Sequence, residues 1–181
     1  MSTADDPDDR DVRRRQLAKR LVFHHARTQT VSEFTGFSRN QLETLRRRWG
    51  VPTHERHRGP SPTSFTEFFR NARTVQEATA AAVLFDLLHV RPRSRNVNLP
   101  CPTKLEQGER LCYVFEALQA CFPDLELEFE HMMLLVTGLS RGEALRLSSC
   151  AQCGSALLVD NFAARIPACK HCSRDALPGS I

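Results

Sequence analysis

The chain has no apolar run long enough to cross a membrane, and its N-terminus is acidic and polar where a secretory signal peptide would be basic and then apolar. It also has no internal repeat, no glycine-rich loop of the phosphate-binding kind, and no Ser/His/Asp or Cys/His pattern typical of nucleophilic catalysis. These absences argue against a membrane protein and a secreted protein. They also argue against an enzyme that binds phosphate through a glycine-rich loop and against one that uses a Ser/His/Asp or Cys/His nucleophile. They predict a cytoplasmic protein that is not an enzyme.

The composition is that of a soluble globular protein. Of the 181 residues, 41% are hydrophobic and 25% are charged, and the length allows one ordinary domain or two small ones. Seven cysteines, an odd number, fit a reducing compartment in which thiols need not pair. The net charge of +4 is unevenly distributed: residues 10–58 contain 13 Lys/Arg against 4 Asp/Glu, whereas residues 99–145 contain 3 against 8. The basic segment predicts an anionic partner.

Four of the cysteines form two C-x2-C pairs that are separated by 15 residues. This spacing is typical of a closed four-thiolate site, because each two-residue spacer lets both sulfurs of a pair reach one ion from a tight turn. Gly154 follows the first pair, where such a turn needs a left-handed backbone. The pattern predicts one structural Zn²⁺ per chain as the cofactor, because no coordination position stays open for catalysis. The predicted ligands are Cys150, Cys153, Cys169 and Cys172.

Two alternatives remain open for these cysteines. The four thiols could be without metal or joined as two disulfides, although a chain with no sign of secretion favours zinc. His171, which lies inside the second pair, could also replace one cysteine as a ligand.

The basic N-terminal third has the pattern of a helix-turn-helix. Apolar residues recur at helical spacing from Asp11 to Thr28, with basic residues between them, which predicts an amphipathic helix with a basic outer face. Gly36 can end one helix, and Ser38 can cap the next, which is predicted to run from Arg39 to Trp49 and to stop at Gly50.

This second helix has the side chains expected of a DNA recognition helix. Leu42, Leu45 and Trp49 share one face that would anchor it, and arginine and amide side chains, which pair bidentately with guanine and adenine, occupy the rest. The proline-rich loop that follows carries basic residues suited to phosphate contacts. A solvated helix face and a plain connecting loop are the alternative interpretations. The predicted DNA-binding residues are Arg39, Asn40, Gln41, Arg46, Arg47, Arg48, His54, Arg56 and Arg58.

The remaining pattern predicts helices at residues 64–88, 103–122 and 125–137, and a short strand at 144–148 that leads into the cysteine pairs. The predicted fold is therefore mainly α, a helical domain with a helix-turn-helix-like segment and a small C-terminal zinc ribbon held by four cysteines. Its predicted parts are a disordered acidic leader at 1–9, a helical DNA- and partner-binding domain at 10–140, and a zinc-binding segment at 141–181.

The last predicted helix carries acidic residues beside two methionines. Glu126, Glu128 and Glu130 adjoin Met132 and Met133, and such flexible apolar side chains can form an adaptable partner surface, although they are also common in cores. This surface motivates an alternative function, a zinc-stapled protein-interaction adaptor that does not bind DNA.

The segment at 145–154, LRLSSCAQCG, resembles the Leu-x-Leu-Ser-Ser-Cys-x-x-Cys-Gly signature of the FlhC family, the zinc-containing subunit of the bacterial flagellar master transcriptional activator. The resemblance continues in residues 162–172, in residues 37–39 and in the proline-containing loop before Phe65. It implies a mostly helical fold with the four cysteines as zinc ligands and a DNA-facing surface around Arg39. It also implies that the chain acts on promoter DNA with an FlhD-like subunit in a hetero-oligomer and with RNA polymerase, activating flagellar or motility genes.

Overall fold

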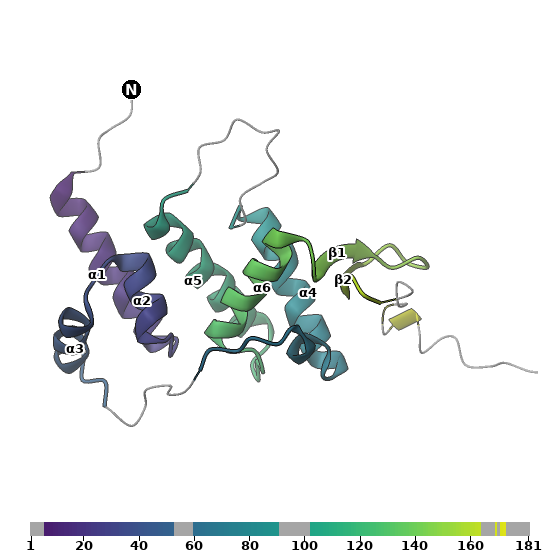
Figure 1. The fold of residues 1–181 in the computed structure, drawn as a ribbon, viewed down its shortest axis with the longest axis horizontal. Helices are drawn as coiled ribbons and strands as arrows, with labels where there is room; N and C mark the ends of the chain where they lie inside the picture. The colour runs from purple at the N-terminus through teal and green to yellow at the C-terminus, as the bar shows by residue number, and fades with distance from the viewer. Residues whose placement is uncertain (1–5, 53–59, 91–101, 164–168, 170, 173–181) are drawn as a thin grey trace, which may run out of the picture. The chain divides into compact units, whose positions relative to one another are not determined.

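The computed structural model describes residues 6–52, 60–90, 102–163, 169 and 171–172. In this part of the chain α-helices dominate and the strands form a two-stranded sheet, which confirms the predicted mainly α fold (Figure 1). The chain divides into two compact units, one of Met1–Ser61 with Pro92–Tyr113 and one of Pro62–Arg91 with Val114–Ile181. Among the described helices, none is both long and apolar enough to cross a membrane.

Helix α1 (Pro7–Phe23) begins and ends earlier than the sequence pattern predicted. The carboxylate of Asp6 caps it by accepting a hydrogen bond from the backbone N–H of Asp8 at 3.2 Å, and Pro7 stands at the start, where a missing N–H costs nothing. Residues 7–9, which were predicted to belong to the disordered leader, are therefore helical. The helix stops before His25, whose φ of 58° lies outside the right-handed helical region.

Helices α2 (Thr28–Thr35) and α3 (Arg39–Arg48) form the helix-turn-helix pair. The sequence pattern predicted that a helix ends at Gly36, but it did not predict that this helix begins at Thr28. Gly36 ends α2 with a φ of 70°, and Ser38 caps α3 as predicted. The Ser38 hydroxyl accepts from the Gln41 N–H at 3.3 Å, and the Gln41 side chain accepts from the Ser38 N–H at 2.8 Å.

The second unit begins with a 3-10 helix, η2 (Phe65–Phe69), and continues in α4 (Ala72–Leu87), so the helix predicted at 64–88 is divided. Asn71 supplies the new cap, because its side chain accepts from the N–H groups of both Arg73 and Thr74. Helix α5 (Lys104–Cys121) contributes residues to both units.

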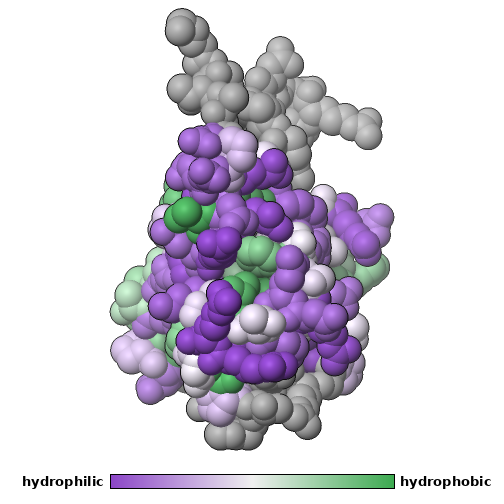
Figure 2. Space-filling view, turned by 90° about the vertical axis from the view of Figure 1, so that its left-hand side faces the viewer, coloured by the Kyte–Doolittle hydropathy of each residue, from purple (hydrophilic) through white to green (hydrophobic). Residues whose placement is uncertain are grey.

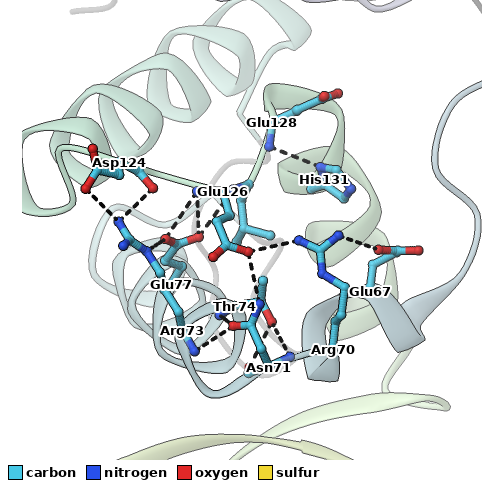
Figure 3. A network of polar contacts seen from close by, with 11 residues as sticks. Glu67, Arg70, Asn71, Arg73, Thr74, Glu77, Asp124, Glu126, Glu128 and His131 are labelled. Atoms are coloured by element: carbon cyan, nitrogen blue, oxygen red, sulfur yellow. Dashed lines mark hydrogen bonds and ion pairs between the residues drawn. The ribbon is translucent and has the colours of Figure 1, made fainter.

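Helix α6 (Phe129–Arg141) starts four residues later than predicted, because the segment before it is held in an extended form by a buried carboxylate. Glu77 of α4 is fully buried and accepts from the N–H of Glu126 at 3.1 Å and of Leu127 at 3.2 Å, as Figure 3 shows for the surrounding network. Arg73 donates to the same carboxylate at 3.0 Å and to the Asp124 carbonyl at 2.7 Å. These bonds fix the connection between α5 and α6 against α4.

The hairpin consists of β1 (Leu145–Ser149) and β2 (Ala156–Asp160), antiparallel with Leu147 opposite Leu158. It packs against α4 and α6, and its buried residues join the core of this unit. A hydrogen bond also joins the hairpin to α4: the Leu158 N–H donates to the Thr79 hydroxyl at 3.0 Å. The β1–β2 turn therefore projects the first cysteine pair from a rigid base.

Candidate metal centre and basic helix surface

The structure brings the four predicted cysteines together. Their sulfur atoms all lie within 4.8 Å of one another, and Cys153 Sγ is 3.5 Å from Cys169 Sγ. A tetrahedral zinc site with bonds of about 2.3 Å places its sulfurs about 3.8 Å apart, so the observed cluster has the right size for one ion. All four cysteines are reduced thiols, and His171 is exposed and outside the cluster. The described residues therefore support neither the disulfide alternative nor the histidine ligand.

The turn between β1 and β2 positions the first pair. Cys150 follows the last residue of β1, and its N–H donates to the Ser155 carbonyl at 2.9 Å, while its own carbonyl accepts from Gly154 N–H at 2.9 Å. Gly154 has a φ of 72°, the left-handed conformation that the sequence predicted at this position. The Ser155 hydroxyl lies 3.2 Å from Cys153 Sγ and supplies a polar neighbour for that sulfur.

The electrostatics of the cluster favour a bound cation. Backbone N–H groups, first that of Cys169 at 3.4 Å, lower the pKa of Cys150 to about 6. Hydrogen bonds to the sulfurs of Cys153 and Cys169 instead hold the proton on Cys172 and raise the pKa of that thiol. Four adjacent sulfurs cannot all carry negative charge unless a cation compensates it. The cluster can thus hold a metal ion, and four thiolates suit a soft or borderline ion such as zinc.

The predicted DNA-binding residues of α3 fall into two groups. Arg46 is only 4% exposed and donates to the Thr28 hydroxyl at 2.8 Å, with Glu43 at 3.6 Å, so it is a structural residue and its assignment to DNA was wrong. Leu42 is buried as predicted, and Leu45 and Trp49 are half-buried. His54, Arg56 and Arg58 lie outside the described residues. The remaining predicted residues are all exposed: Arg39, Asn40, Gln41, Arg47 and Arg48.

Helices α1 and α3 line an open hollow of about 670 Å³, called the basic hollow below. Phe37, Leu45 and Trp49 form its apolar part. Figure 2 shows the side of the molecule that carries these helices, a predominantly hydrophilic surface with few apolar side chains. The polar lining residues are Arg15, Gln16 and Lys19 of α1 with Asn40, Gln41, Thr44 and Arg48 of α3.

Sequence reasoning did not predict that these two helix faces meet. The spacing of residues 15, 16 and 19 marks one helical face of α1, but nothing local indicates which helix it adjoins. Arg47, another of the predicted DNA-binding residues, is exposed but does not line the hollow. The structure thus assigns different surroundings to two adjacent arginines: Arg48 lines the hollow with α1, and Arg47 does not.

Two other arginines of α1 make contacts within the fold and do not form part of an exposed basic face. Arg14 donates from Nε to the Thr35 carbonyl at 2.6 Å, and its guanidinium lies 4.6 Å from the centre of the Phe37 ring. It therefore fixes the α2–α3 turn against α1. Arg13 pairs with Glu109 of α5 at 2.8 Å.

No protein-family model matches the chain, and no curated protein gives a significant match.

Proposed function

We propose that this chain is the DNA-binding subunit of a transcriptional activator of the FlhC type, stabilised by one structural Zn²⁺ and without enzymatic activity. The observation that carries the proposal is the basic hollow. It combines the exposed polar face of a capped helix-turn-helix second helix with two cationic side chains of α1. Arginine, lysine and amide side chains on one open surface are what DNA binding requires.

The two helices have different tasks in this mechanism. Arg15 and Lys19 of α1 bind phosphates, which supplies salt-dependent affinity and sets the orientation of the protein on the duplex. Asn40, Gln41 and Arg48 reach base edges from the N-terminal and hollow-facing sides of α3, where their amide and guanidinium groups distinguish bases. The basic residues His54, Arg56 and Arg58, which follow α3 in the sequence, would add contacts to the DNA backbone.

Cys150, Cys153, Cys169 and Cys172 would hold the zinc. The ion would supply the positive charge that lets all four sulfurs be thiolates, together with the energy that orders the segment around them. The chain's own residues orient the site: the Ser155 carbonyl and Gly154 N–H shape the first turn, and the Cys169 N–H stabilises the Cys150 sulfur. With four sulfur ligands the site has a structural role.

The proposal includes the partners that the sequence resemblance implies. An FlhD-like subunit completes the DNA-binding unit in a hetero-oligomer, RNA polymerase is recruited at promoters of flagellar or motility genes, and the complex works in the cytoplasm. The alternative, an adaptor without DNA binding, has less support: Glu126 and Glu128 are exposed, but Glu130 and Met132 are buried in the core and Met133 is half-buried.

Fluorescence anisotropy with labelled promoter DNA tests the proposal. The chain should bind alone or with the FlhD-like protein, and the logarithm of its affinity should fall linearly with the logarithm of salt concentration. Arg48→Ala should cost about 1 to 3 kcal/mol and relax base preference, whereas Arg47→Ala, outside the hollow, should cost less. If this chain and the FlhD-like protein co-purify but do not bind DNA at low salt, the result would support the adaptor instead.

A further inference from the structure

One corner of the cysteine cluster is open to solvent. Cys153 is exposed and Cys169 is half-buried. Cys150 and Cys172, by contrast, are only 3% and 9% exposed. The turn that carries Cys153 is itself uncovered, because residues 151–156 are all exposed. A small solute can therefore reach the sulfur of Cys153 directly, whereas burial restricts its access to the other pair of sulfurs.

The surroundings of the sulfurs also differ. The N–H of Cys169 donates to Cys150 Sγ at 3.4 Å, and a bond of this kind orients a buried sulfur and withdraws electron density from it. Cys153 Sγ has the Ser155 hydroxyl at 3.2 Å and Cys169 Sγ at 3.5 Å. A second cysteine sulfur is therefore in contact with the exposed one.

Metal coordination would make these sulfurs reactive toward an oxidant. A coordinating thiol is deprotonated outright, and the thiolate is the form of cysteine that acts as a nucleophile. Four thiolates on one Zn²⁺ leave the centre negatively charged, so its sulfurs remain electron-rich. Cys121 is also exposed, but it lies outside the cluster and would not be deprotonated by the same ion. Exposure and thiolate character thus coincide at Cys153.

We propose that Cys153 is a site of oxidation by hydrogen peroxide, and that Cys169 converts the oxidised sulfur into a disulfide with loss of the metal. The Cys153 thiolate attacks one peroxide oxygen, the O–O bond breaks, and a sulfenic acid forms as hydroxide leaves. The Cys169 thiolate then attacks the Cys153 sulfur, the S–O bond breaks, and a second hydroxide leaves. Two electrons pass from the two sulfurs to the peroxide, and protons from the solvent convert both hydroxides to water.

The disulfide removes two of the four ligands. Cys150 and Cys172 alone cannot hold the ion as four sulfurs do, so they take up protons and the ion leaves. The new bond joins one cysteine of each C-x2-C pair, which keeps the two pairs together until a thiol reductant restores all four sulfurs. The inference rests on the proposed function only for the identity of the ion as zinc.

Peroxide treatment of the full-length, zinc-loaded protein tests this inference. A chromogenic chelator follows the released zinc, and peptide mapping without reduction identifies the disulfide. Zinc should leave as a disulfide forms between Cys153 and Cys169, and a thiol reductant added with zinc should reverse both changes. A disulfide between Cys150 and Cys153, or zinc that stays bound while Cys121 is oxidised, would overturn the inference.

Two histidine substitutions separate the exposed position from the metal site as a whole. Cys153→His and Cys172→His each leave three cysteines and one histidine, a ligand set that still holds zinc. Cys153→His should slow the release of zinc by peroxide about tenfold, because susceptibility to oxidation follows exposure. Cys172→His keeps both Cys153 and Cys169 and should release zinc at the wild-type rate. Equal rates in the two variants would contradict the role given to Cys153.

The failure of this inference differs from the failure of the proposed function. Protein that keeps its zinc throughout peroxide treatment would support the proposed metal and overturn the inference. Protein that contains no zinc but forms the disulfide between Cys153 and Cys169 would contradict the proposed metal and support the oxidation step.

Discussion

Arg46 of α3 donates a hydrogen bond from its guanidinium to the side-chain hydroxyl of Thr28, the first residue of α2, at 2.8 Å. It is the first of three consecutive arginines that composition alone does not distinguish, and its neighbours Arg47 and Arg48 are exposed. The bond links the two helices of the helix-turn-helix and separates one arginine that holds the fold from others that can bind a ligand.

Arg46→Ala should therefore destabilise the fold. The change removes a charge-assisted hydrogen bond and the packing of a buried side chain, and the free energy of unfolding should fall by about 1.5 to 3 kcal/mol. Urea unfolding followed by circular dichroism measures this loss. Arg47→Ala is the matched control and should stay within about 0.5 kcal/mol of wild type, since it is a surface substitution. Equal stability of the two variants would contradict the role given to Arg46.

Glu77→Ala should be more damaging. It removes a fully buried carboxylate and leaves the N–H groups of Glu126 and Leu127 without their acceptor, which should lower the free energy of unfolding by about 2 to 4 kcal/mol. Glu77→Gln should lose less, because the amide oxygen can still accept one bond. In the same urea assay, Glu67→Gln removes an exposed ion pair with Arg70 and should change stability by under about 1 kcal/mol.

His131 should make stability depend on pH. Burial lowers its pKa, and its neutral Nδ1 accepts the Glu128 N–H at 3.1 Å at the start of α6, with Glu67, Arg70 and Glu130 also nearby. Because the folded-state pKa lies below the ordinary value of about 6.5, the contribution is fully present above that pH and is lost as pH falls.

The variant His131→Gln isolates this contribution, since glutamine at the same position of a capping box accepts the bond without titrating. Unfolding midpoints in urea should decline more steeply for wild type than for the variant between about pH 6.5 and pH 5. Parallel pH profiles for the two proteins would show that His131 is not the group responsible.

Removal of the metal should unfold the C-terminal segment selectively. Cys150→Ser or treatment with a strong chelator should abolish binding of one equivalent of zinc. Each sulfur is one of four ligands, and together they give a zinc-binding free energy on the order of 10 kcal/mol that also orders the segment. Metal content and limited proteolysis measure the two effects. Cys121→Ser changes an exposed cysteine outside the cluster and should leave both unchanged. Retained zinc in Cys150→Ser would remove the metal assignment.

Features set by neighbouring residues could be predicted from the sequence. The Ser38 cap, the end of α2 at Gly36 and the meeting of the four cysteines each depend on a few adjacent residues or on a fixed spacing. The start of α1 was missed although Asp6 followed by Pro7 is a recognisable helix-start signal, because the acidic composition there was interpreted as disorder.

Features set by distant residues could not be predicted. The extended segment before α6 depends on Glu77, about fifty residues earlier in the chain. The burial of Arg46 depends on Thr28, and the basic hollow depends on the approach of α1 to α3. Helical periodicity gives each helix an inner and an outer face, but it does not specify which side of the outer face adjoins another helix.

The most direct test of DNA binding by the basic hollow is the salt dependence of anisotropy for a pair of double variants. Arg15→Ala/Lys19→Ala removes two proposed phosphate contacts, and the slope of log affinity against log salt should become shallower by about 2. Arg141→Ala/Arg146→Ala removes two exposed arginines of the other unit and should leave the slope unchanged. Wild-type protein that does not bind DNA at low salt, or slopes that change equally in both variants, would contradict the account.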